Sequence, residues 1–288
     1  MAQTLELRKG AEPFPGYRLV QFLGRGGWGE VWKAQPPQGE PLALKFLPTE
    51  SQLAAVQEVR ALQSIRQLHH ENLIHIEQIW CCAGYLVIAM EMAEGSLLDL
   101  FDVYLSEFNT PIFADHLCFF LSQAAAALDF LNTRQHHVND QRVAIRHCDV
   151  KPSNLLIKGR TVKLADFSLS VLTTSPMWFH RRWGTLNYAG PEVFVGRLSE
   201  WTDEYALAVT YCQLRGGRLP FADTPDQFTT TYVRPAPDLS MLSKRERPII
   251  ARALDPVPQN RWPTCTEMMQ HLASSLTASS AQILVGAR

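Results

Sequence analysis

The periodicity of this 288-residue sequence changes near residue 94, and that change constrains the fold more than any other feature. From Tyr17 to Met92, short runs alternate apolar and polar residues as strands do, with one helical interruption. Beyond Glu94, apolar residues recur at the spacing of helices. We therefore predict an α+β fold, in which a small antiparallel β-sheet lobe with one helix precedes a larger, mainly helical lobe.

The same pattern predicts individual elements. Two strands are expected within 17–35, around a glycine cluster, and further strands at 40–48, 72–81 and 85–92. Helices are expected at 51–68, 114–134, 204–215, 245–254 and 264–276, the last capped by Thr264 with Glu267 three residues on. The predicted division is an N-terminal extension 1–16, a first lobe 17–92, a second lobe 93–275, and a tail or linker 276–288.

Composition narrows the classes of function. Lysine and arginine number 27 against 28 acids, so no overall charge would attract nucleic acid, and none is expected as a partner. The six cysteines form no CxxC pair, which predicts reduced thiols and a cytoplasmic location. The most apolar stretches fall short of the roughly 20 residues that cross a bilayer, so no membrane segment is expected in this chain.

A glycine cluster lies between the first two predicted strands. The stretch GRGGWGEV supplies Gly24, Gly26 and Gly29, which allow a backbone to approach a phosphate without side-chain obstruction. This spacing also occurs in dinucleotide-binding folds, but there a helix follows the glycines. Here a second strand follows, which excludes that interpretation.

Lys45 and Glu58 are a second candidate pair. Lys45 lies on a predicted strand between Leu44 and Phe46, and Glu58 lies thirteen residues later on the predicted helix. The carboxylate of Glu58 could orient the ammonium of Lys45 toward phosphate oxygens. Each residue alone also has an ordinary explanation, as a lysine on an exposed strand edge and a solvated glutamate.

The stretch IRHCDVKPSNLL, residues 145–156, places Asp149, Lys151 and Asn154 on one short loop. Asp166 follows at the end of the apolar run VKLADFSLS, where an aspartate can also be a turn former. Asn154 and Asp166 together offer two hard oxygen ligands for magnesium. Asp149 would then accept or orient a hydroxyl proton, with Lys151 near a transferred phosphoryl group.

In this order, the motifs resemble the protein kinase family, in its bacterial eukaryotic-like Ser/Thr branch, over about residues 17–275. The stretch DVKPSN is the Ser/Thr form of the family's catalytic loop, and GTLNYAGPE resembles its substrate-side loop. The resemblance implies a bilobal kinase-like fold, ATP and Mg²⁺ as cofactors, and protein substrates with serine or threonine acceptors.

The resemblance also implies residue roles. Lys45 would contact the α and β phosphates with Glu58 as its ion-pair partner, Asp149 would be the catalytic base, and Lys151 would assist it. Asn154 and Asp166 would bind the metal, Thr185 would lie in the substrate loop, and Asp99 would reach ribose or substrate. The implied nucleotide contacts, besides Lys45, are Leu23, Gly24, Gly26, Gly29, Val31, Ala43, Met90, Glu91, Ala93 and Leu156. Glu192 with Arg261, and Asp203, match structural ties of the family.

Three residues depart from the family pattern. Cys148 stands where many members have an arginine that pairs with a phosphorylated loop, which suggests that this contact does not switch the protein. Ser168 replaces a glycine after Asp166, which predicts a less mobile loop. Gly190 replaces an alanine, a change expected to be tolerated. Candidate phosphorylation sites are Thr173, Thr174 and Ser175, with Arg181 or Arg182 to bind the phosphate, and exposed loop residues without a switch are the alternative.

The sequence therefore predicts an ATP-dependent Ser/Thr protein kinase. The runner-up is a pseudokinase that acts as a nucleotide-binding or scaffolding module, an idea motivated by Cys148 and Ser168. A third hypothesis is a small-molecule kinase on the same fold. It is less favoured because GTLNYAGPE resembles a loop that binds a peptide substrate. Homodimer formation stays open. His136 and His137 are expected to be surface residues rather than metal ligands.

Overall fold

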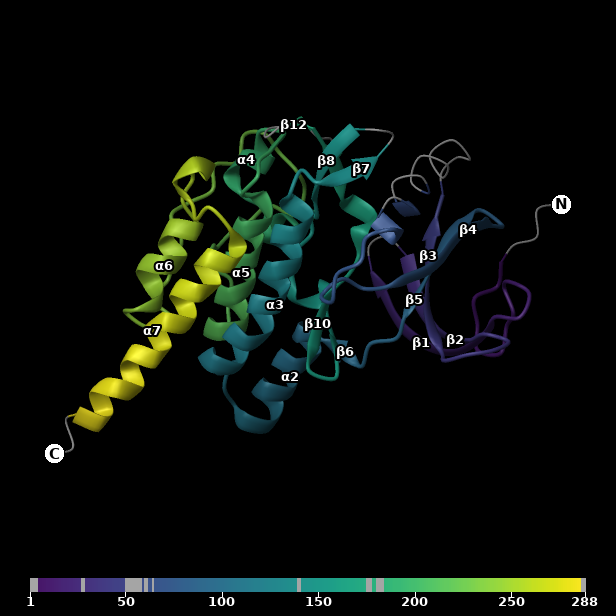
Figure 1. Cartoon of the computed structure of the whole chain (residues 1–288), viewed down its shortest axis with the longest axis horizontal. Coiled ribbons are helices and arrows are strands. Elements are labelled where there is room, and N and C mark those ends of the chain that lie inside the picture. The colour runs from purple at the N-terminus through teal and green to yellow at the C-terminus, as the bar shows by residue number, and fades with distance from the viewer. Residues whose placement is uncertain are drawn as a thin grey trace. The chain divides into compact units, whose positions relative to one another are not determined.

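The computed structural model describes residues 5–26, 29–49, 59, 62–63, 65–138, 141–174, 178–179 and 184–285. The chain divides into two compact units, one of Met1–His69 with Leu73–Glu94 and one of His70–Asn72 with Gly95–Arg288. The first is built mainly on a β-sheet and the second mainly on helices (Figure 1). The predicted α+β fold, with a sheet lobe and a helical lobe, is confirmed.

The first unit contains a five-stranded antiparallel sheet. Its strands β1 (Arg18–Gly26), β2 (Gly29–Gln35), β3 (Leu42–Pro48), β4 (Ile76–Cys82) and β5 (Tyr85–Glu91) lie in the order β1-β2-β3-β5-β4. Each predicted strand of this lobe is therefore present, with ends shifted by a few residues. One face of the sheet buries a core of Leu19, Trp32, Ala34, Leu44, Phe46, Val87 and Ala89.

The helix predicted at 51–68 lies largely outside the described residues. Of that segment, residues 59, 62–63 and 65–66 are helical, and Leu62 and Ile65 are buried. Both buried positions belong to the apolar face that the sequence predicts. Glu58, the implied partner of Lys45, is outside the described residues.

The second unit is organised around helix α3 (Ala114–Asn132), which packs against α5 (Thr202–Gly216) and α7 (Cys265–Val285) (Figure 1). These helices and α6 (Glu246–Ala253) match the predicted positions. The predicted cap of α7 is also present, because the Thr264 hydroxyl accepts the Glu267 N–H at 3.0 Å. Helix α7 continues to Val285, so much of the segment predicted as a tail or linker is helical.

Helix α2 (Leu97–Phe108) was missed by the sequence prediction, although its start carries a signal. Ser96 and Asp99 form a capping box, in which the Ser96 side chain accepts the Asp99 N–H and Asp99 accepts the Ser96 N–H. The Asp99 carboxylate also accepts the Ser96 hydroxyl at 2.7 Å. Asp99 therefore stabilises the start of α2 in this structure, whereas the family resemblance implied a ribose or substrate contact.

Short strands connect the helices of the second unit. Strands β7 (His136–Val138) and β8 (Gln141–Arg146) form a hairpin, and β11 (Val171–Thr173) pairs with β8. Strands β9 (Leu155–Lys158) and β10 (Thr161–Leu164) form a second hairpin, joined by β6 (Gly95–Ser96), and β12 (Trp178–Phe179) pairs with β13 (Arg197–Leu198). These elements are too short to show clear periodicity, which is why the sequence prediction missed most of them.

The expectation that His136 is a surface residue is wrong. The side chain is 8% exposed, and its Nε2 lies 2.8 Å from the Phe130 carbonyl at the end of α3. Its ring also packs edge-on against Phe130. His136 therefore joins the β7–β8 hairpin to α3, whereas His137 beside it is exposed.

Helix α5 contains a buried glutamate, Glu204, with only one of its two carboxyl oxygens hydrogen-bonded among the described residues. Glu204 is 2% exposed; its Oε1 accepts the Trp262 N–H at 3.1 Å, while Oε2 has no hydrogen-bond partner among the described residues. Burial raises the pKa of Glu204 to about 8, although the Trp262 hydrogen bond and Arg261 oppose the rise. The folded chain therefore retains a proton that the unfolded chain releases near pH 4.5.

We expect Glu204→Gln to remove a pH-dependent loss of stability. The raised folded pKa means that the free energy of unfolding falls as pH rises from about 4.5 to 8, by roughly 3–5 kcal/mol. Urea unfolding at pH 5 and pH 8 should show similar stability for both proteins at pH 5 and a more stable variant at pH 8. Glu107→Gln on the exposed face of α2 is the matched control. Parallel pH dependence in Glu204→Gln and the unaltered protein would contradict this account.

Candidate active site

The loop that follows β8 is held in place from α5. Both carboxylate oxygens of Asp203 accept backbone N–H groups of this loop, from His147 and from Cys148, each at 2.8 Å. The His147 ring contacts the Ala165 carbonyl at 2.9 Å, one residue before Asp166. Asp203 therefore fixes the backbone that carries Asp149, and His147 connects that backbone to the segment that carries Asp166.

Cys148 adopts a backbone conformation that is rare for a residue with a side chain. Its φ is +66°, in the left-handed region, and the hydrogen bond to Asp203 holds it there. Burial and the Asp203 carboxylate raise the pKa of the Cys148 thiol well above its ordinary value. The thiol is therefore protonated at neutral pH, so Cys148 lacks the thiolate character of a redox or nucleophilic cysteine.

Asp149 is the centre of a hydrogen-bond network. Its Oδ1 accepts the Thr185 N–H at 2.9 Å and the Thr185 hydroxyl at 2.8 Å. Its Oδ2 accepts the Asn154 amide at 2.9 Å and lies 2.8 Å from Lys151 Nζ. The structure thus brings Thr185 together with the three loop residues that the sequence analysis selected, Asp149, Lys151 and Asn154.

These contacts also set the charge of Asp149. Burial alone would raise the pKa of this carboxyl, but the Lys151 charge and the hydrogen bonds from Lys151 and Thr185 outweigh burial and lower it. Asp149 is therefore ionised at neutral pH. A buried carboxylate in this state can accept a hydrogen bond from a hydroxyl group and orient it.

Lys151 joins the catalytic loop to the segment around Thr185. Its Nζ donates to the Thr185 hydroxyl at 2.7 Å, in addition to its ion pair with Asp149. Gly184, just before Thr185, approaches the loop so closely that an added Cβ would lie 2.1 Å from the Cys148 carbonyl oxygen. Glycine is therefore required at this position for Thr185 to reach Asp149.

Asn154 and Asp166 fit a magnesium site that is completed by a phosphorylated ligand. The Asn154 amide nitrogen donates to the Asp149 carbonyl at 2.7 Å and to its carboxylate, so the amide oxygen is the atom left to bind a cation. Asp166 has φ 68°, and the N–H of Ala165 beside it donates to the Asn154 carbonyl at 2.9 Å. No group of three or more His, Cys, Asp or Glu side chains that could hold a metal occurs within the described part of the chain. Two protein oxygens plus phosphate oxygens is the usual arrangement for Mg²⁺.

The glycine-rich hairpin and Lys45 lie in the first unit. Gly24 pairs with Val31, and Gly26 with Gly29, so the glycines form the end of the β1–β2 hairpin. Gly29 has φ +154°, and an added Cβ would lie 2.0 Å from the Phe46 carbonyl oxygen. Glycine is therefore required at position 29 by both conformation and space.

Lys45 is 8% exposed on β3, paired with Val31 of β2 and Ile88 of β5. It is therefore a buried residue of an interior strand, and the alternative of an exposed-edge lysine is wrong. A lysine is rarely buried unless a charged or polar partner compensates it.

The residues implied to contact adenine are distributed over both units. Ala43 and Met90 are direct partners across β3 and β5, and Glu91 ends β5. Ala93 follows two residues later, and Leu23 lies on β1 and is 43% exposed. Leu156 lies on β9 in the other unit, where it pairs with Lys163.

The candidate phosphorylation sites differ in exposure. Thr173 is 2% exposed in β11, where its hydroxyl is inaccessible in this conformation, whereas Thr174 is exposed. Ser175, Arg181 and Arg182 are outside the described residues. Thr174 is therefore the better candidate of the two threonines.

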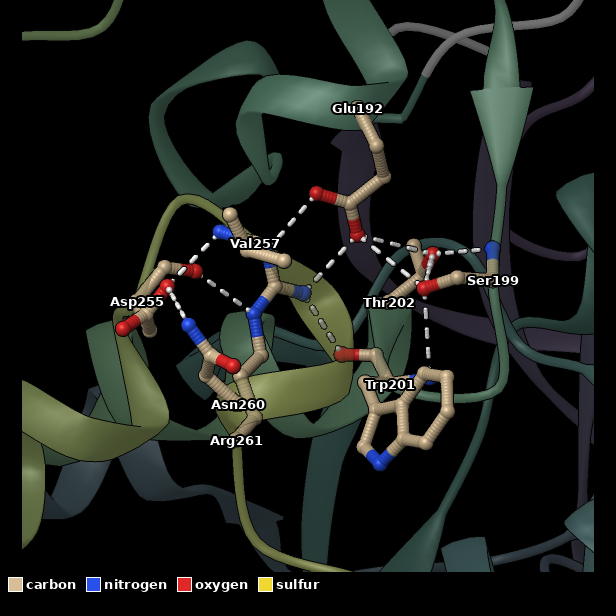
Figure 2. Close-up of polar contacts among 8 residues, drawn as sticks. All are labelled: Glu192, Ser199, Trp201, Thr202, Asp255, Val257, Asn260 and Arg261. Atoms are coloured by element: carbon tan, nitrogen blue, oxygen red, sulfur yellow. Dashed lines mark hydrogen bonds and ion pairs between the residues drawn. The ribbon is translucent and has the colours of Figure 1, made fainter.

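A buried ion pair holds the segment after Thr185 (Figure 2). Arg261 donates to both oxygens of Glu192, at 2.9 and 2.8 Å, and to the Trp201 carbonyl at 3.1 Å. At Gly190, an added Cβ would lie 2.5 Å from a Glu192 carboxylate oxygen. The glycine that replaces the family's alanine is thus fitted to the Glu192–Arg261 pair.

Arg234 was not selected in the sequence analysis, although it contacts the segment that follows Thr185. Its Nη2 donates to the Leu186 carbonyl at 2.5 Å, directly after Thr185, and its guanidinium lies over the rings of Phe221 and Phe194. These interactions fix the backbone of the Thr185 segment from a loop after α5. Arg234 stands between Val233 and Pro235 in an irregular stretch, so no periodicity could have indicated its role.

Residues 17–273 match the family model described as the protein kinase domain. Because the match covers most of the chain, the chain belongs to the protein kinase family. Within the described part of the chain, no helix has the length and apolar character that crossing a membrane requires.

The chain is similar to named protein kinases at modest identity. It is 28% identical over 261 residues to CBL-interacting protein kinase 30 of Oryza sativa subsp. japonica, covering 85% of this chain and 51% of the relative. It is 27% identical over 287 residues to serine/threonine-protein kinase PknF of Mycobacterium tuberculosis, covering 91% and 57%. The chain thus spans about half the length of these relatives.

A crystal structure supports the fold assignment. The kinase domain of Mycobacterium tuberculosis PknI, solved as a point mutant, has a TM-score of 0.68 to this structure. The two chains share 24% identity, and the match covers 94% of this chain and 99% of the other. At this identity the comparison shows the fold alone.

Proposed function

We propose that this protein transfers the γ-phosphoryl group of ATP to serine or threonine hydroxyls of protein substrates. The observation that carries the proposal is the Asp149 network, in which an ionised, buried carboxylate is contacted by Lys151, Asn154 and Thr185. The DVKPSN form of the loop and the names of the relatives support the Ser/Thr assignment.

Each residue of the network has a role in this reaction. Asp149 accepts a hydrogen bond from the acceptor hydroxyl and orients its oxygen toward the phosphorus. Lys151 places positive charge near the transferred group, and Thr185 fixes the position of both side chains. Catalysis of phosphoryl transfer depends mainly on such positioning and charge stabilisation.

In this proposal Asn154 and Asp166 would hold Mg²⁺, which would neutralise charge on the phosphates. Lys45 would contact the α and β phosphates, with Glu58 as the ion-pair partner that the family resemblance implies. The glycines of the β1–β2 hairpin cover the phosphates, and the remaining nucleotide contacts are Leu23, Val31, Ala43, Met90, Glu91, Ala93 and Leu156. The partners are cytoplasmic proteins with serine or threonine acceptors, and the exposed Thr174 is a candidate phosphorylation site.

Two assays on the same preparation test the proposal. Binding of ATP with Mg²⁺ is measured by calorimetry, and transfer is measured with a generic basic protein and with the chain itself as acceptors. Magnesium-dependent binding together with transfer to serine or threonine supports the proposed function. Binding without transfer to any acceptor would instead identify a pseudokinase, and absence of binding would contradict both.

A further inference from the structure

We propose that Ser168 is a positioning residue for Asp166, holding its carboxylate in the orientation that binds the divalent cation. This inference rests on the proposed function, in which Asp166 is a metal ligand. Ser168 is also one of the three departures from the family pattern, which places glycine at this position. The structure gives its hydroxyl a specific partner that glycine cannot provide.

The contact is made by two groups of Ser168 to one oxygen. The Ser168 hydroxyl lies 2.7 Å from Asp166 Oδ1, and the Ser168 N–H lies 3.4 Å from the same atom. In this hydrogen bond the Ser168 hydroxyl is the donor and Asp166 Oδ1 is the acceptor. At 2.7 Å, the hydroxyl contact is much shorter than the backbone contact and lies at the usual length of an O–H···O hydrogen bond. Glycine would retain the longer backbone contact and lose the shorter one.

The backbone conformation of residues 166–168 shows whether glycine is needed at position 168. Asp166 is in the left-handed region at φ 68°, whereas Ser168 is not among the described residues with positive φ. The Phe167 ring is buried and packs against the His147 ring at a centroid distance of 5.1 Å. The conformation therefore does not require glycine at position 168, and a residue with a hydroxyl can stand there without strain.

The hydrogen bond from Ser168 is expected to affect metal affinity because it limits rotation of the Asp166 side chain. Rotation about the side-chain torsions of Asp166 moves both oxygens, and the hydrogen bond from Ser168 restricts that rotation. Groups that hydrogen-bond a metal ligand fix its orientation, and their loss typically weakens metal affinity about 10- to 100-fold. We therefore expect Ser168 to strengthen cation binding by preorganising Asp166.

The test uses Mn²⁺, which calorimetry or electron paramagnetic resonance can detect, with the chain saturated by a non-hydrolysable ATP analogue. Ser168→Ala should weaken Mn²⁺ binding roughly tenfold, at the lower end of that range. Ser168→Thr retains the hydroxyl and should stay within about threefold of the unaltered chain. Ser170→Ala is the matched control, because its hydroxyl donates to the His147 carbonyl at 3.4 Å rather than to Asp166.

A second readout needs neither metal nor nucleotide. Hydrogen–deuterium exchange of segment 165–170 should be faster in Ser168→Ala and Ser168→Gly, and unchanged in Ser168→Thr. Weaker Mn²⁺ binding with unchanged exchange would make the hydroxyl a direct metal contact and overturn the positioning role. Equal Mn²⁺ affinity in Ser168→Ala and the unaltered chain would also overturn it, as would an equal loss in Ser170→Ala.

Failure of the proposed function gives a different pattern. If the unaltered chain binds the ATP analogue and Mn²⁺ but transfers no phosphate, the proposed function fails while the Ser168 inference is still tested by Mn²⁺ affinity. If the unaltered chain and all variants bind neither the analogue nor Mn²⁺ with it, both are contradicted. A selective effect of Ser168→Ala on Mn²⁺, with analogue binding present throughout, supports the positioning role of Ser168. Phosphate transfer by the unaltered chain, measured separately, decides the proposed function.

Discussion

Asp149→Asn is expected to reduce phosphoryl transfer about a thousandfold while leaving ATP affinity nearly unchanged. A positioned general base contributes a rate factor of roughly 10² to 10⁴, and asparagine cannot accept a proton in its place. The measurement is kcat with saturating ATP and a protein acceptor, alongside the dissociation constant of ATP. Asp102→Asn on the exposed face of α2 is the matched control and should retain full activity.

Asp149→Asn is also expected to lower the stability of the fold, and the experiment must separate this effect from the loss of catalysis. The amide oxygen of asparagine can still accept both Thr185 donors, but its NH₂ group would face the Lys151 ammonium and the Asn154 amide, which are donors too. A melting curve should therefore show lower stability but a folded protein at the assay temperature. Turnover by folded Asp149→Asn equal to that of the unaltered chain would contradict the assignment of Asp149.

Arg261→Ala is expected to lower the free energy of unfolding by roughly 3–5 kcal/mol. The Arg261 side chain is fully buried, and it makes two hydrogen bonds to Glu192, one to the Trp201 carbonyl and one to the Asp255 carbonyl (Figure 2). After its removal, the hydrogen-bond donors to the buried Glu192 carboxylate that remain among the described residues are the hydroxyls of Thr202 and Ser199. The measurement is urea unfolding, with the slope checked for two-state behaviour.

An exposed ion pair provides the comparison. Arg218 and Asp238 are 2.6 Å apart with side chains 46% and 58% exposed, so Arg218→Ala should lower stability far less than Arg261→Ala. Arg261→Lys keeps the charge but loses the two-pronged geometry, and it should be intermediate in stability. If Arg261→Ala does not fold, the stability of Arg261→Lys still tests the contribution of the buried ion pair. Equal losses in Arg218→Ala and Arg261→Lys would contradict a special role for the buried pair.

The sequence predicts the fold because long elements carry strong periodic signals. The strands of the first unit and the long helices α3, α5 and α7 follow this rule. Short elements carry too few residues for a period, and the β7–β8 hairpin was therefore missed. Helix α2 was missed although Ser96 and Asp99 form its capping box and its buried Leu97, Phe101 and Tyr104 recur at helical spacing.

The candidate site is predictable only where its residues are close in sequence. Asp149, Lys151 and Asn154 lie within six positions, and the structure places their side chains in one network. Thr185 enters through the family resemblance, and its contact with Asp149 depends on the close approach of Gly184. Arg234 reaches Leu186 from 48 residues away, and burial of Glu204 depends on packing between helices, so neither had a local signal.

The most direct test of the central claim is transfer of radiolabel from γ-labelled ATP in the presence of Mg²⁺, followed by phosphoamino-acid analysis. The unaltered chain and Asp149→Asn are assayed together, with each chain and a generic basic protein as acceptors. The account predicts label on serine or threonine with the unaltered chain alone. Absence of label in both reactions, with ATP bound by both proteins, would contradict it and identify a nucleotide-binding pseudokinase.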